Sequence, residues 1–414
     1  MSIKIIHHFM NNWKKVFAII WSGQLFSTLS SAIVGYAVVF WLSMETKSAE
    51  VLAFATIAAL LPQLVLGPFT GVLIDRWDRR RTMIVADTFI AVCSAIMGIL
   101  FWIGRVEVSY LYILLALRSV GSAFHVPAMH ASVPLLAPES ELMRIAGVNQ
   151  VIQSVGTIAG PALAALLISV FNMTSVLFVD VAGALIGCIS LLLVHIPNPE
   201  RKEGAPAPHI FREMKEGLHE IYSRPGLLWL FIVIIGATFF IMPVAALFPL
   251  LTINHFSGGT YQMSIIEVAW GVGMLAGGAL MGIKRFKMNE IVQINATYIL
   301  LGLTFVFSGI LPVTGFWIFM VLTFFGGISM AVYSAAFMVV MQTTITPAAL
   351  GRVFSIYGSV TLLPSMIGLL QTGFIADRIG VPHAFLISGL AIVLLGAGSF
   401  FIPAIRQMIA KARL

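Results

Sequence analysis

Charge is scarce in this sequence. Only 10% of the 414 residues are Asp, Glu, Lys or Arg, whereas 59% are apolar, and the mean hydropathy is +0.99. A soluble fold is excluded, because soluble domains carry about 25% charged residues to cover their surface. The apolar stretches repeatedly reach the roughly twenty residues with which a helix crosses a bilayer. They lack the alternating polarity of membrane β-strands, so the sequence predicts an all-α membrane protein.

Cysteine is nearly absent, and so are the motifs of enzymes. The two cysteines, Cys93 and Cys188, fall inside apolar stretches, where packing residues are favoured over a disulfide. The phosphate-binding pattern G-x-x-x-x-G-K-[ST] does not occur, and no polar segment is long enough for a nucleotide-binding domain. The stretch HEIYS, residues 219–223, lacks the second histidine of a zinc motif, and no G-x-S-x-G occurs. We therefore expect a protein that is not an enzyme and that carries no metal and no cofactor.

Twelve apolar stretches of helix length are present. They lie near residues 16–44, 49–74, 82–104, 108–134, 145–171, 173–194, 227–253, 261–283, 289–311, 314–342, 351–375 and 382–403. The only long polar connection divides these spans into two sets of six. We expect an N-terminal six-helix bundle over residues 1–194, a cytoplasmic linker over 195–226 and a C-terminal six-helix bundle over 227–414.

The two halves of the chain resemble each other weakly. GGALMGIKRFK, residues 277–287, leaves the eighth span where TGVLIDRWDRR, residues 70–80, leaves the second. Duplicated six-span halves are typical of transporters that work by alternating access. In the linker, residues 209–223 carry an apolar face, which predicts an interfacial helix on the membrane surface. A docking site for a partner protein is the alternative interpretation of that segment.

The positive charges lie almost entirely on one side of the predicted topology. Of the 24 Lys and Arg residues, only Lys47, Arg105 and Arg378 fall in loops of the opposite side, and Arg118 falls inside a span. Because cytoplasmic loops carry the excess of Lys and Arg, we expect both termini to be cytoplasmic. We expect a multi-pass protein of the plasma membrane of a bacterium. The net charge of +7 then reflects topology, and no nucleic-acid partner is needed.

The densest charge lies in GVLIDRWDRRRT, residues 71–82. Positive-inside anchoring explains the arginines, but it requires neither Asp75 nor Gly71. An acid at the end of the second span can bind the N-terminus of a neighbouring helix, whose dipole favours negative charge. We expect a conformational latch formed by Gly71, Asp75, Arg76, Arg79 and Arg80, and an anchor alone is the alternative.

Four ionisable residues lie inside predicted spans, namely Asp87, Arg118, Asp180 and Glu267. Charges in hydrocarbon are costly, so such residues face protein or a wet cavity and mark function. An acid exposed in turn to each side can bind and release a proton, which makes Asp180, Glu267 and Asp87 candidates for proton coupling. Arg118 cannot discharge, so its expected part in the coupling is to perturb an adjacent acid or to bind backbone carbonyls. A purely structural role is the alternative for each. Asp87, near the start of its span, is also a candidate member of the loop 71–82 network.

Two groups of residues are candidates for the substrate cavity. Gln24, Thr28 and Ser31 form a polar stripe at helical spacing on the first span, which carries no acid. Phe239 and Met242 lie near Pro243 in the seventh span, and aromatic and thioether side chains suit a site for large amphiphiles. Ordinary packing is the alternative interpretation for these side chains. His125, which lies two helical turns beyond Arg118 on the same face, is interpreted as a packing residue.

Several motifs together resemble the major facilitator superfamily. Residues 71–80 match its loop 2–3 signature, with Asp78 at a usual glycine position, and LRSVG, residues 117–121, is similar to its fourth-span signature. Gly156, Gly160 and Pro161 resemble the fifth-span signature of drug–proton antiporters. RSVGSAFHVPA, REMKEG, MLAGGALMG, LGRVFS and ADRIG, in matching order, are similar to the macrolide-efflux branch.

This resemblance implies a function as well as a fold. It implies the major facilitator fold and a proton-driven exporter, by alternating access, of macrolide-type or similar bulky amphipathic compounds. The implied partners are such a small amphipathic substrate, protons and the lipid bilayer, and a monomer is expected. The resemblance also implies that Asp75 locks to the start of the eleventh span, and that Gly156, Gly160 and Pro161 form a flexible, conformational point. An exporter of the same build for a siderophore, lipid or other metabolite is the alternative, and the fifth-span signature disfavours an importer.

Overall fold

The computed structural model describes residues 3–74, 77–136, 138, 141–194, 196, 215, 218–283, 288–345 and 347–411. Within them, all regular structure is helical, and twelve helices are long and apolar enough to cross a membrane. The expected all-α membrane fold with twelve spans is therefore confirmed. The chain divides into two compact units, the first of Met1–Trp41 and Ala55–Ala205, the second of Leu42–Phe54 and Pro206–Leu414.

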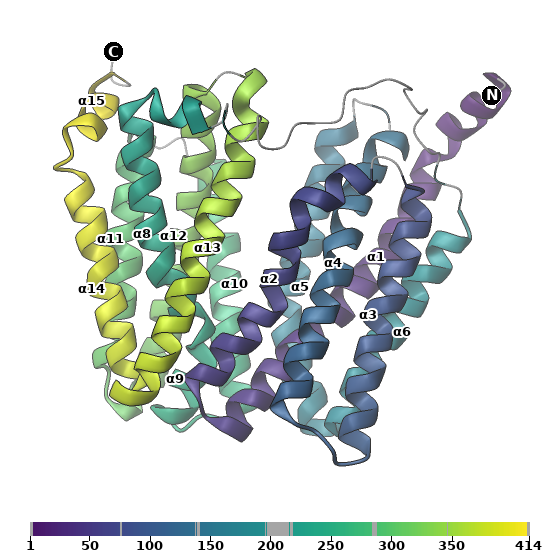
Figure 1. The fold of residues 1–414 in the computed structure, drawn as a ribbon, viewed down its shortest axis with the longest axis horizontal. Helices are drawn as coiled ribbons and strands as arrows, with labels where there is room; N and C mark the ends of the chain where they lie inside the picture. The colour runs from purple at the N-terminus through teal and green to yellow at the C-terminus, as the bar shows by residue number, and fades with distance from the viewer. Residues whose placement is uncertain are drawn as a thin grey trace. The chain divides into compact units, whose positions relative to one another are not determined.

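The first unit is built from the helices α1 (Ile3–Thr46), α2 (Ala49–Ile74), α3 (Arg79–Trp102), α4 (Val108–Leu136), α5 (Leu142–Val170) and α6 (Met173–Leu192), of which α1 and α2 extend into the second unit. α3 packs along both α4 and α6 (Figure 1). Two helices begin at side-chain caps, since Asp78 accepts a hydrogen bond from the Arg81 N–H and Asn172 accepts one from the Ser175 N–H. The caps fix where α3 and α6 start, and with them the depth of every residue along these helices.

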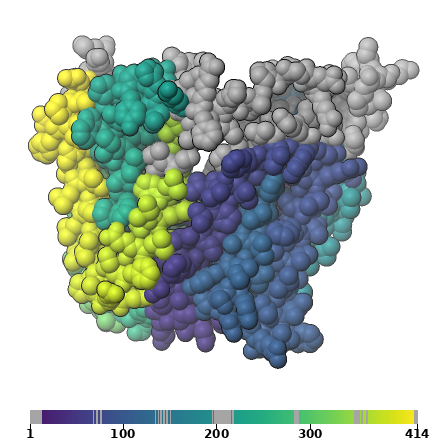
Figure 2. Space-filling view, viewed as in Figure 1, coloured from purple at the N-terminus to yellow at the C-terminus, as the bar shows by residue number. Residues whose placement is uncertain are grey.

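The second unit contains the remaining helices. They are α8 (Pro225–Ala246), α9 (Phe248–Asn254), α10 (Thr260–Ile283), α11 (Glu290–Ile310), α12 (Phe316–Thr344), α13 (Pro347–Ile379), α14 (Val381–Ser399) and α15 (Pro403–Lys411), with a 3-10 turn at Val313–Gly315. α11 packs against α12 and α14, and α10 packs against α12. The side chains of α8, α13 and α14 meet on one face of this unit (Figure 2).

The seventh span differs from the single helix expected over 227–253. It is broken at Leu247 into α8 and α9, with Pro243 in the last turn of α8 and Pro249 in the first turn of α9. A proline has no N–H to donate and restricts the residue before it, so Pro249 is favourable at the start of a helix and unfavourable within one. The interfacial helix expected over 209–223 falls largely outside the described residues.

The hairpin between α1 and α2, residues 42–54, is held by the end of α13. Lys47 turns the chain with a φ of 51°. The Asp377 carboxylate then accepts hydrogen bonds from the Ala49 N–H at 2.7 Å, from the Glu50 N–H at 3.1 Å and from the Ser48 hydroxyl at 2.7 Å. Asp377 thus caps the N-terminus of α2 from another helix, and it satisfies amides that have no partner inside α2.

Candidate functional site

A buried ion pair lies at the centre of the first unit. The Arg118 guanidinium on α4 donates to the Asp180 carboxylate on α6, and both side chains are buried. Asp180 also accepts hydrogen bonds from the hydroxyls of Ser94 on α3, at 2.6 Å, and Ser31 on α1, at 2.7 Å. A third hydroxyl, that of Ser30, lies 3.3 Å away. Four helices therefore converge on one carboxylate, and a buried charge of this kind is tolerated only when it is paired and hydrogen-bonded in this way.

Small residues bring α1 and α6 close enough for this convergence. A Cβ at Gly183 would lie 2.6 Å from the Ser30 Cβ, and one at Gly187 would lie 3.1 Å from the Ser27 Cβ. The helical spacing of Asp180 with Gly183 and Gly187 predicts that Asp180 lies on a closely packed face, and this prediction is confirmed. Close backbone approach through glycine and serine is typical of helix contacts in membranes.

A second polar contact adjoins this ion pair. The Asp87 carboxylate on α3 lies 3.3 Å from the His125 imidazole on α4 and accepts a hydrogen bond from the Ser27 hydroxyl at 3.2 Å. Asp87 is 3% exposed and His125 is 7% exposed. The described partners of Asp87 thus lie on α4 and α1, and its expected place in the loop 71–82 network stays a prediction. α3 already begins at Arg79, so Asp87 lies more than two turns inside the helix and faces α1 and α4.

Gln24 lies beside the Asp87–His125 contact. Its side chain is fully buried, and both the Gln24 amide and the Asp87 carboxylate approach Gly187 of α6. Within the described part of the chain, neither polar atom of the Gln24 side chain has a hydrogen-bond partner, and neither has the second carboxylate oxygen of Asp87. We use the name buried charge cluster for the set Gln24, Ser27, Ser30, Ser31, Asp87, Ser94, Arg118, His125 and Asp180.

Sequence reasoning found part of this cluster and missed part of it. The four in-span ionisable residues include Asp87, Arg118 and Asp180, which the structure brings together in the first unit. His125 was interpreted as a packing residue, yet it pairs with Asp87. Its position seven residues after Arg118 puts both side chains on one face of α4, but this spacing does not identify Asp87 as the partner.

The arginines of the loop signature contact helix ends within the first unit. The Arg79 guanidinium donates to the Ala131 carbonyl in the last turns of α4, and that of Arg80 donates to the Leu192 carbonyl at the end of α6, at 2.8 Å. Cations are favourable at the C-terminal ends of helices because the helix dipole is negative there. Asp75 and Arg76 lie outside the described residues, and Gly71 lies in the last turn of α2.

The fifth-span motif packs α5 against α1. A Cβ at Gly160 would lie 3.2 Å from both the Ala32 Cβ and the Tyr36 ring, and one at Gly156 would lie 3.8 Å from the Ala32 Cβ. Pro161 lies inside α5, where it removes one backbone hydrogen bond. The motif therefore lies at a tight helix contact.

Glu267 lies on a different kind of surface in the second unit. It is half-buried on α10, and it shares a face with Met274, which is 36% exposed, and Gly278, where an added Cβ would meet open space. The tight contact of α10 with α12 is instead made by Gly273 and Gly277. On the face that carries Glu267, Gly271 is buried whereas Gly278 meets open space, so the expectation of a closely packed face stays a prediction.

The residues proposed for the substrate cavity are divided between the two units. Thr28 is half-buried, and Ser31 donates to Asp180 as part of the buried charge cluster. Phe239 and Met242 on α8 are half-buried, and Phe239 contacts Phe240 edge to face with 5.0 Å between ring centroids.

In the described part of the chain, twelve helices are long and apolar enough to cross a membrane, and several of them bury ionisable side chains among themselves. This arrangement is typical of polytopic membrane transporters. Among the described residues, no three His, Cys, Asp or Glu side chains lie close enough to hold a metal ion.

Comparison with known proteins identifies the family. The sequence profile described as transmembrane secretion effector matches residues 9–412. The chain is 40% identical over 401 residues to macrolide efflux protein A of Streptococcus pyogenes, which covers 97% of this chain and 99% of that protein. It is 39% identical over 322 residues to macrolide efflux protein A of Enterococcus faecalis, over 78% of this chain and 99% of that protein. The chain therefore belongs to the macrolide-efflux family of the major facilitator superfamily.

More distant relatives agree with this assignment. The chain is 28% identical to the multidrug efflux pump Tap of Mycolicibacterium fortuitum, over 89% of this chain and 91% of that protein. Its fold matches a solved bacterial homologue of the lysosomal transporter Spinster, with a TM-score of 0.70 at 12% identity over 95% of this chain and 97% of that one. It also matches the fold of the nucleoside transporter NupG, with a TM-score of 0.72 at 13% identity, over 92% of this chain and 99% of that one. The protein is thus a multi-pass bacterial membrane exporter of small molecules, and not an enzyme.

Proposed function

We propose that the protein exports macrolide-type or similar bulky amphipathic compounds in exchange for protons, by alternating access across the plasma membrane. The observation that carries the substrate class is the 40% identity to macrolide efflux protein A over nearly the whole of both chains. Proton coupling is supported by the ionisable groups inside the spans, because such groups are costly unless they are used.

The buried charge cluster is the proposed proton-coupling site of the first unit. Protonation of Asp180 would break its ion pair with Arg118 and leave a buried cation without a partner, which costs about 3–5 kcal/mol. Arg118 cannot discharge, so it must move to another acceptor when Asp180 binds a proton. Proton binding can therefore be linked to a movement of α4 against α6.

Asp87, with its partner His125, is a second candidate for proton coupling in the same unit. The Asp87–His125 contact lies on α3 and α4, the helices that carry Ser94 and Arg118 of the neighbouring ion pair. Glu267 is the candidate in the second unit. It is an ionisable group inside a span of α10, which suits a group that binds and releases a proton during the cycle.

For the substrate we propose contacts from both units. Phe239 and Met242 offer an aromatic face and a flexible thioether on α8, and Gln24, Thr28 and Ser31 offer polar groups on α1. Because Ser31 also bonds to Asp180, a substrate that competes for the Ser31 hydroxyl would act on the proton site.

We also propose that both termini are cytoplasmic, from the distribution of Lys and Arg, and that the protein works as a monomer. On this topology the loop 71–82 faces the cytoplasm. Gly71, Asp75, Arg76, Arg79 and Arg80 then form a latch that is closed in one conformational state. The tight α1–α5 contact at Gly156, Gly160 and Pro161 is proposed as a point at which the first unit bends.

A transport assay tests the proposed function. The protein is expressed in bacteria that lack their own drug exporters, and accumulation of a radiolabelled macrolide is measured with and without a proton ionophore. We expect low accumulation that rises when the ionophore collapses the proton gradient. Macrolide accumulation that is unchanged by the protein, together with export of a siderophore or lipid, would favour the alternative cargo. Export that survives in vesicles without any pH difference or voltage would contradict proton coupling.

A further inference from the structure

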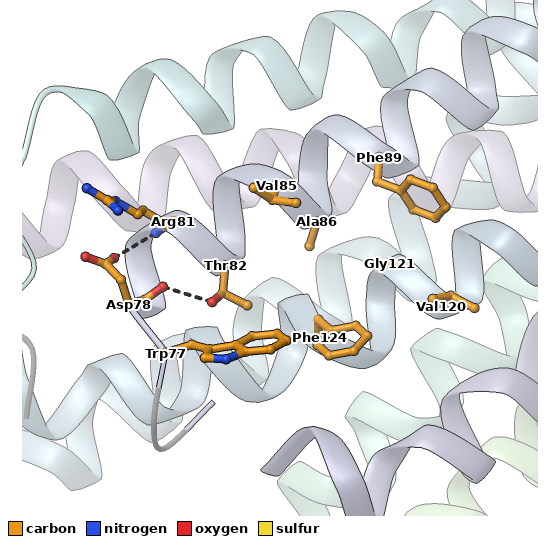
Figure 3. Close-up of a pocket in the computed structure, with 10 residues that line it drawn as sticks. All are labelled: Trp77, Asp78, Arg81, Thr82, Val85, Ala86, Phe89, Val120, Gly121 and Phe124. Atoms are coloured by element: carbon orange, nitrogen blue, oxygen red, sulfur yellow. Dashed lines mark hydrogen bonds between the residues drawn. The ribbon is translucent and has the colours of Figure 1, made fainter. Parts of the chain in front are cut away.

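An open groove of about 650 Å³ lies between the first half of α3 and the middle of α4 (Figure 3). Its walls are Val85 and Phe89 from α3 and Val120 and Phe124 from α4, with Trp77 beside the start of α3. All of these residues belong to the first unit, and the buried charge cluster does not line the groove. The established transport activity assigns no role to it.

Small residues form the floor of this groove. Gly121 of α4 packs directly against α3, since an added Cβ would lie 2.6 Å from Ile90 Cγ1 and 3.3 Å from the Ala86 carbonyl oxygen. The larger side chains that line the groove, from Val85 and Phe89 on α3 and from Val120 and Phe124 on α4, lie on either side of this contact. Trp77 and Phe124 stack with 5.9 Å between ring centroids and 15° between ring planes, so one wall is a continuous aromatic surface.

One end of the groove is charged. Asp78, Arg81 and Thr82 line it there, and the backbone N–H of Arg81 bonds to the Asp78 carboxylate at 2.9 Å. The guanidinium groups of Arg79 and Arg80 donate hydrogen bonds to backbone carbonyls at the ends of α4 and α6. The exposed Arg81 guanidinium has no hydrogen bond or ion pair with any described residue. Of the arginines at positions 79–81, only Arg81 lines the groove, and its guanidinium is the cation that this end of the groove offers to a ligand.

The length of the groove corresponds to one leaflet of a bilayer. From Arg81 to Phe89 the helix rises about 12 Å, and half of a hydrocarbon core measures about 15 Å. Val85 is 67% exposed and Phe89 is 37% exposed, as expected for side chains of a membrane-crossing helix that face hydrocarbon. Trp77 lies at the polar end, where tryptophan is enriched at membrane interfaces.

We propose that this groove binds one anionic phospholipid from the leaflet on the side of the α2–α3 loop. The phosphate contacts Arg81, and one acyl chain lies along Val85, Phe89 and Phe124 over the floor of Ala86 and Gly121. A net negative headgroup is favoured over a zwitterionic one because basic residues at a membrane surface concentrate anionic lipids.

Quenching of Trp77 fluorescence by brominated lipids tests this proposal. The full-length protein is reconstituted in phosphatidylcholine vesicles that contain brominated phosphatidylglycerol, phosphatidylethanolamine or phosphatidylcholine, and the Trp77 signal is obtained as the difference from Trp77→Phe. We expect brominated phosphatidylglycerol to quench at a mole fraction several-fold lower than the other two lipids. Arg81→Gln should lower this preference about fivefold, the effect expected of one basic residue at an anionic surface.

Matched variants separate the charge from the shape of the groove. Arg378→Gln, which removes an exposed arginine at the end of α13, should keep the wild-type preference. Arg81→Lys should retain part of it. Val85→Phe enlarges a mostly exposed side chain, so it should narrow the groove without disturbing the packed interior, and it should weaken quenching by every lipid. Circular dichroism confirms that each variant is folded.

Three results would overturn the proposal. The first is equal quenching by brominated phosphatidylglycerol and phosphatidylcholine in the wild type. The second is an unchanged preference in Arg81→Gln. The third is displacement of the brominated lipid by a macrolide at the concentrations at which the macrolide is transported, because the groove would then be a substrate site.

Discussion

At the scale of single residues, the interaction of Arg118 with Asp180 is the strongest constraint in the first unit. Asp180→Asn removes the charge that balances Arg118, while the amide keeps the shape and some hydrogen bonds with Ser31 and Ser94. We expect a loss of about 3–5 kcal/mol in stability, the cost of leaving a buried charge unpaired. Macrolide export should fall below detection. Thermal unfolding in detergent and drug accumulation measure the two effects.

The double variant Asp180→Asn with Arg118→Gln separates the structural role from the proton-coupling role. Without either charge there is no unpaired ion, so stability should recover to within about 1 kcal/mol of the wild type. Export should stay lost, because the proposed proton-binding group is absent. Recovered export in the stable double variant would show that the pair is only structural.

Single-residue predictions from the sequence succeeded where spacing alone determines a face. Asp180, Gly183 and Gly187 repeat at helical intervals, and the structure places all three against α1. The pairing of Asp87 with His125 could not be predicted in the same way, because it depends on which helix packs next to α3. A single sequence gives the face of a helix but does not name its neighbour.

At the scale of helices, the contact between α1 and α6 depends on the absence of a side chain at Gly183. Gly183→Ala should destabilise the protein by about 1–3 kcal/mol, because the new Cβ overlaps Ser30 and a packed interior cannot absorb it. Gly278→Ala is the matched control, since an added Cβ there meets open space. The midpoint of thermal unfolding should fall for Gly183→Ala alone. Equal midpoints for both variants would contradict the close approach of α1 and α6.

The second prediction at this scale concerns the cap that Asp377 forms at the N-terminus of α2. Asp377→Asn keeps the shape but loses the charge and one acceptor for the Ala49 and Glu50 amides, so we expect a loss of about 1 kcal/mol. Glu45→Gln, an exposed acid in the same hairpin, should have no effect. Hydrogen exchange at the Ala49 and Glu50 amides is the direct readout. Unchanged protection in Asp377→Asn would mean that the cap contributes nothing.

Helix positions were largely predictable because apolar runs of helix length are separated by polar or glycine-containing turns. The second span, for example, is expected over 49–74 and observed as α2 over the same residues. The break at Leu247 was not predicted, since the apolar run continues from α8 into α9 and only Pro249 marks the start of α9. The cap by Asp377 was not predicted either, because it joins residues that are more than 300 positions apart.

At the scale of the whole molecule, charge has two separate uses. Most Lys and Arg residues lie at the helix ends of one predicted side, where they set topology. Arg79 and Arg80 show a further use, because their guanidinium groups hold the ends of α4 and α6 to the start of α3. Arg79 and Arg80 of the loop 71–82 therefore have a structural role within the first unit. Asp75 is the residue of the signature whose role is not explained by topology.

The proposed latch assigns Asp75 a role in the balance between conformational states. A carboxylate at a helix N-terminus contributes about 0.3–2 kcal/mol, and 1.4 kcal/mol corresponds to about a tenfold change in population. Asp75→Asn should therefore lower the export rate several-fold while expression and topology stay unchanged. Drug accumulation measures the rate, and accessibility of single cysteines from each side of the membrane measures the state. Glu107→Gln, an exposed acid in the loop between α3 and α4, is the control. If Asp75→Asn retains full drug resistance and an unchanged accessibility pattern, the loop is an anchor only.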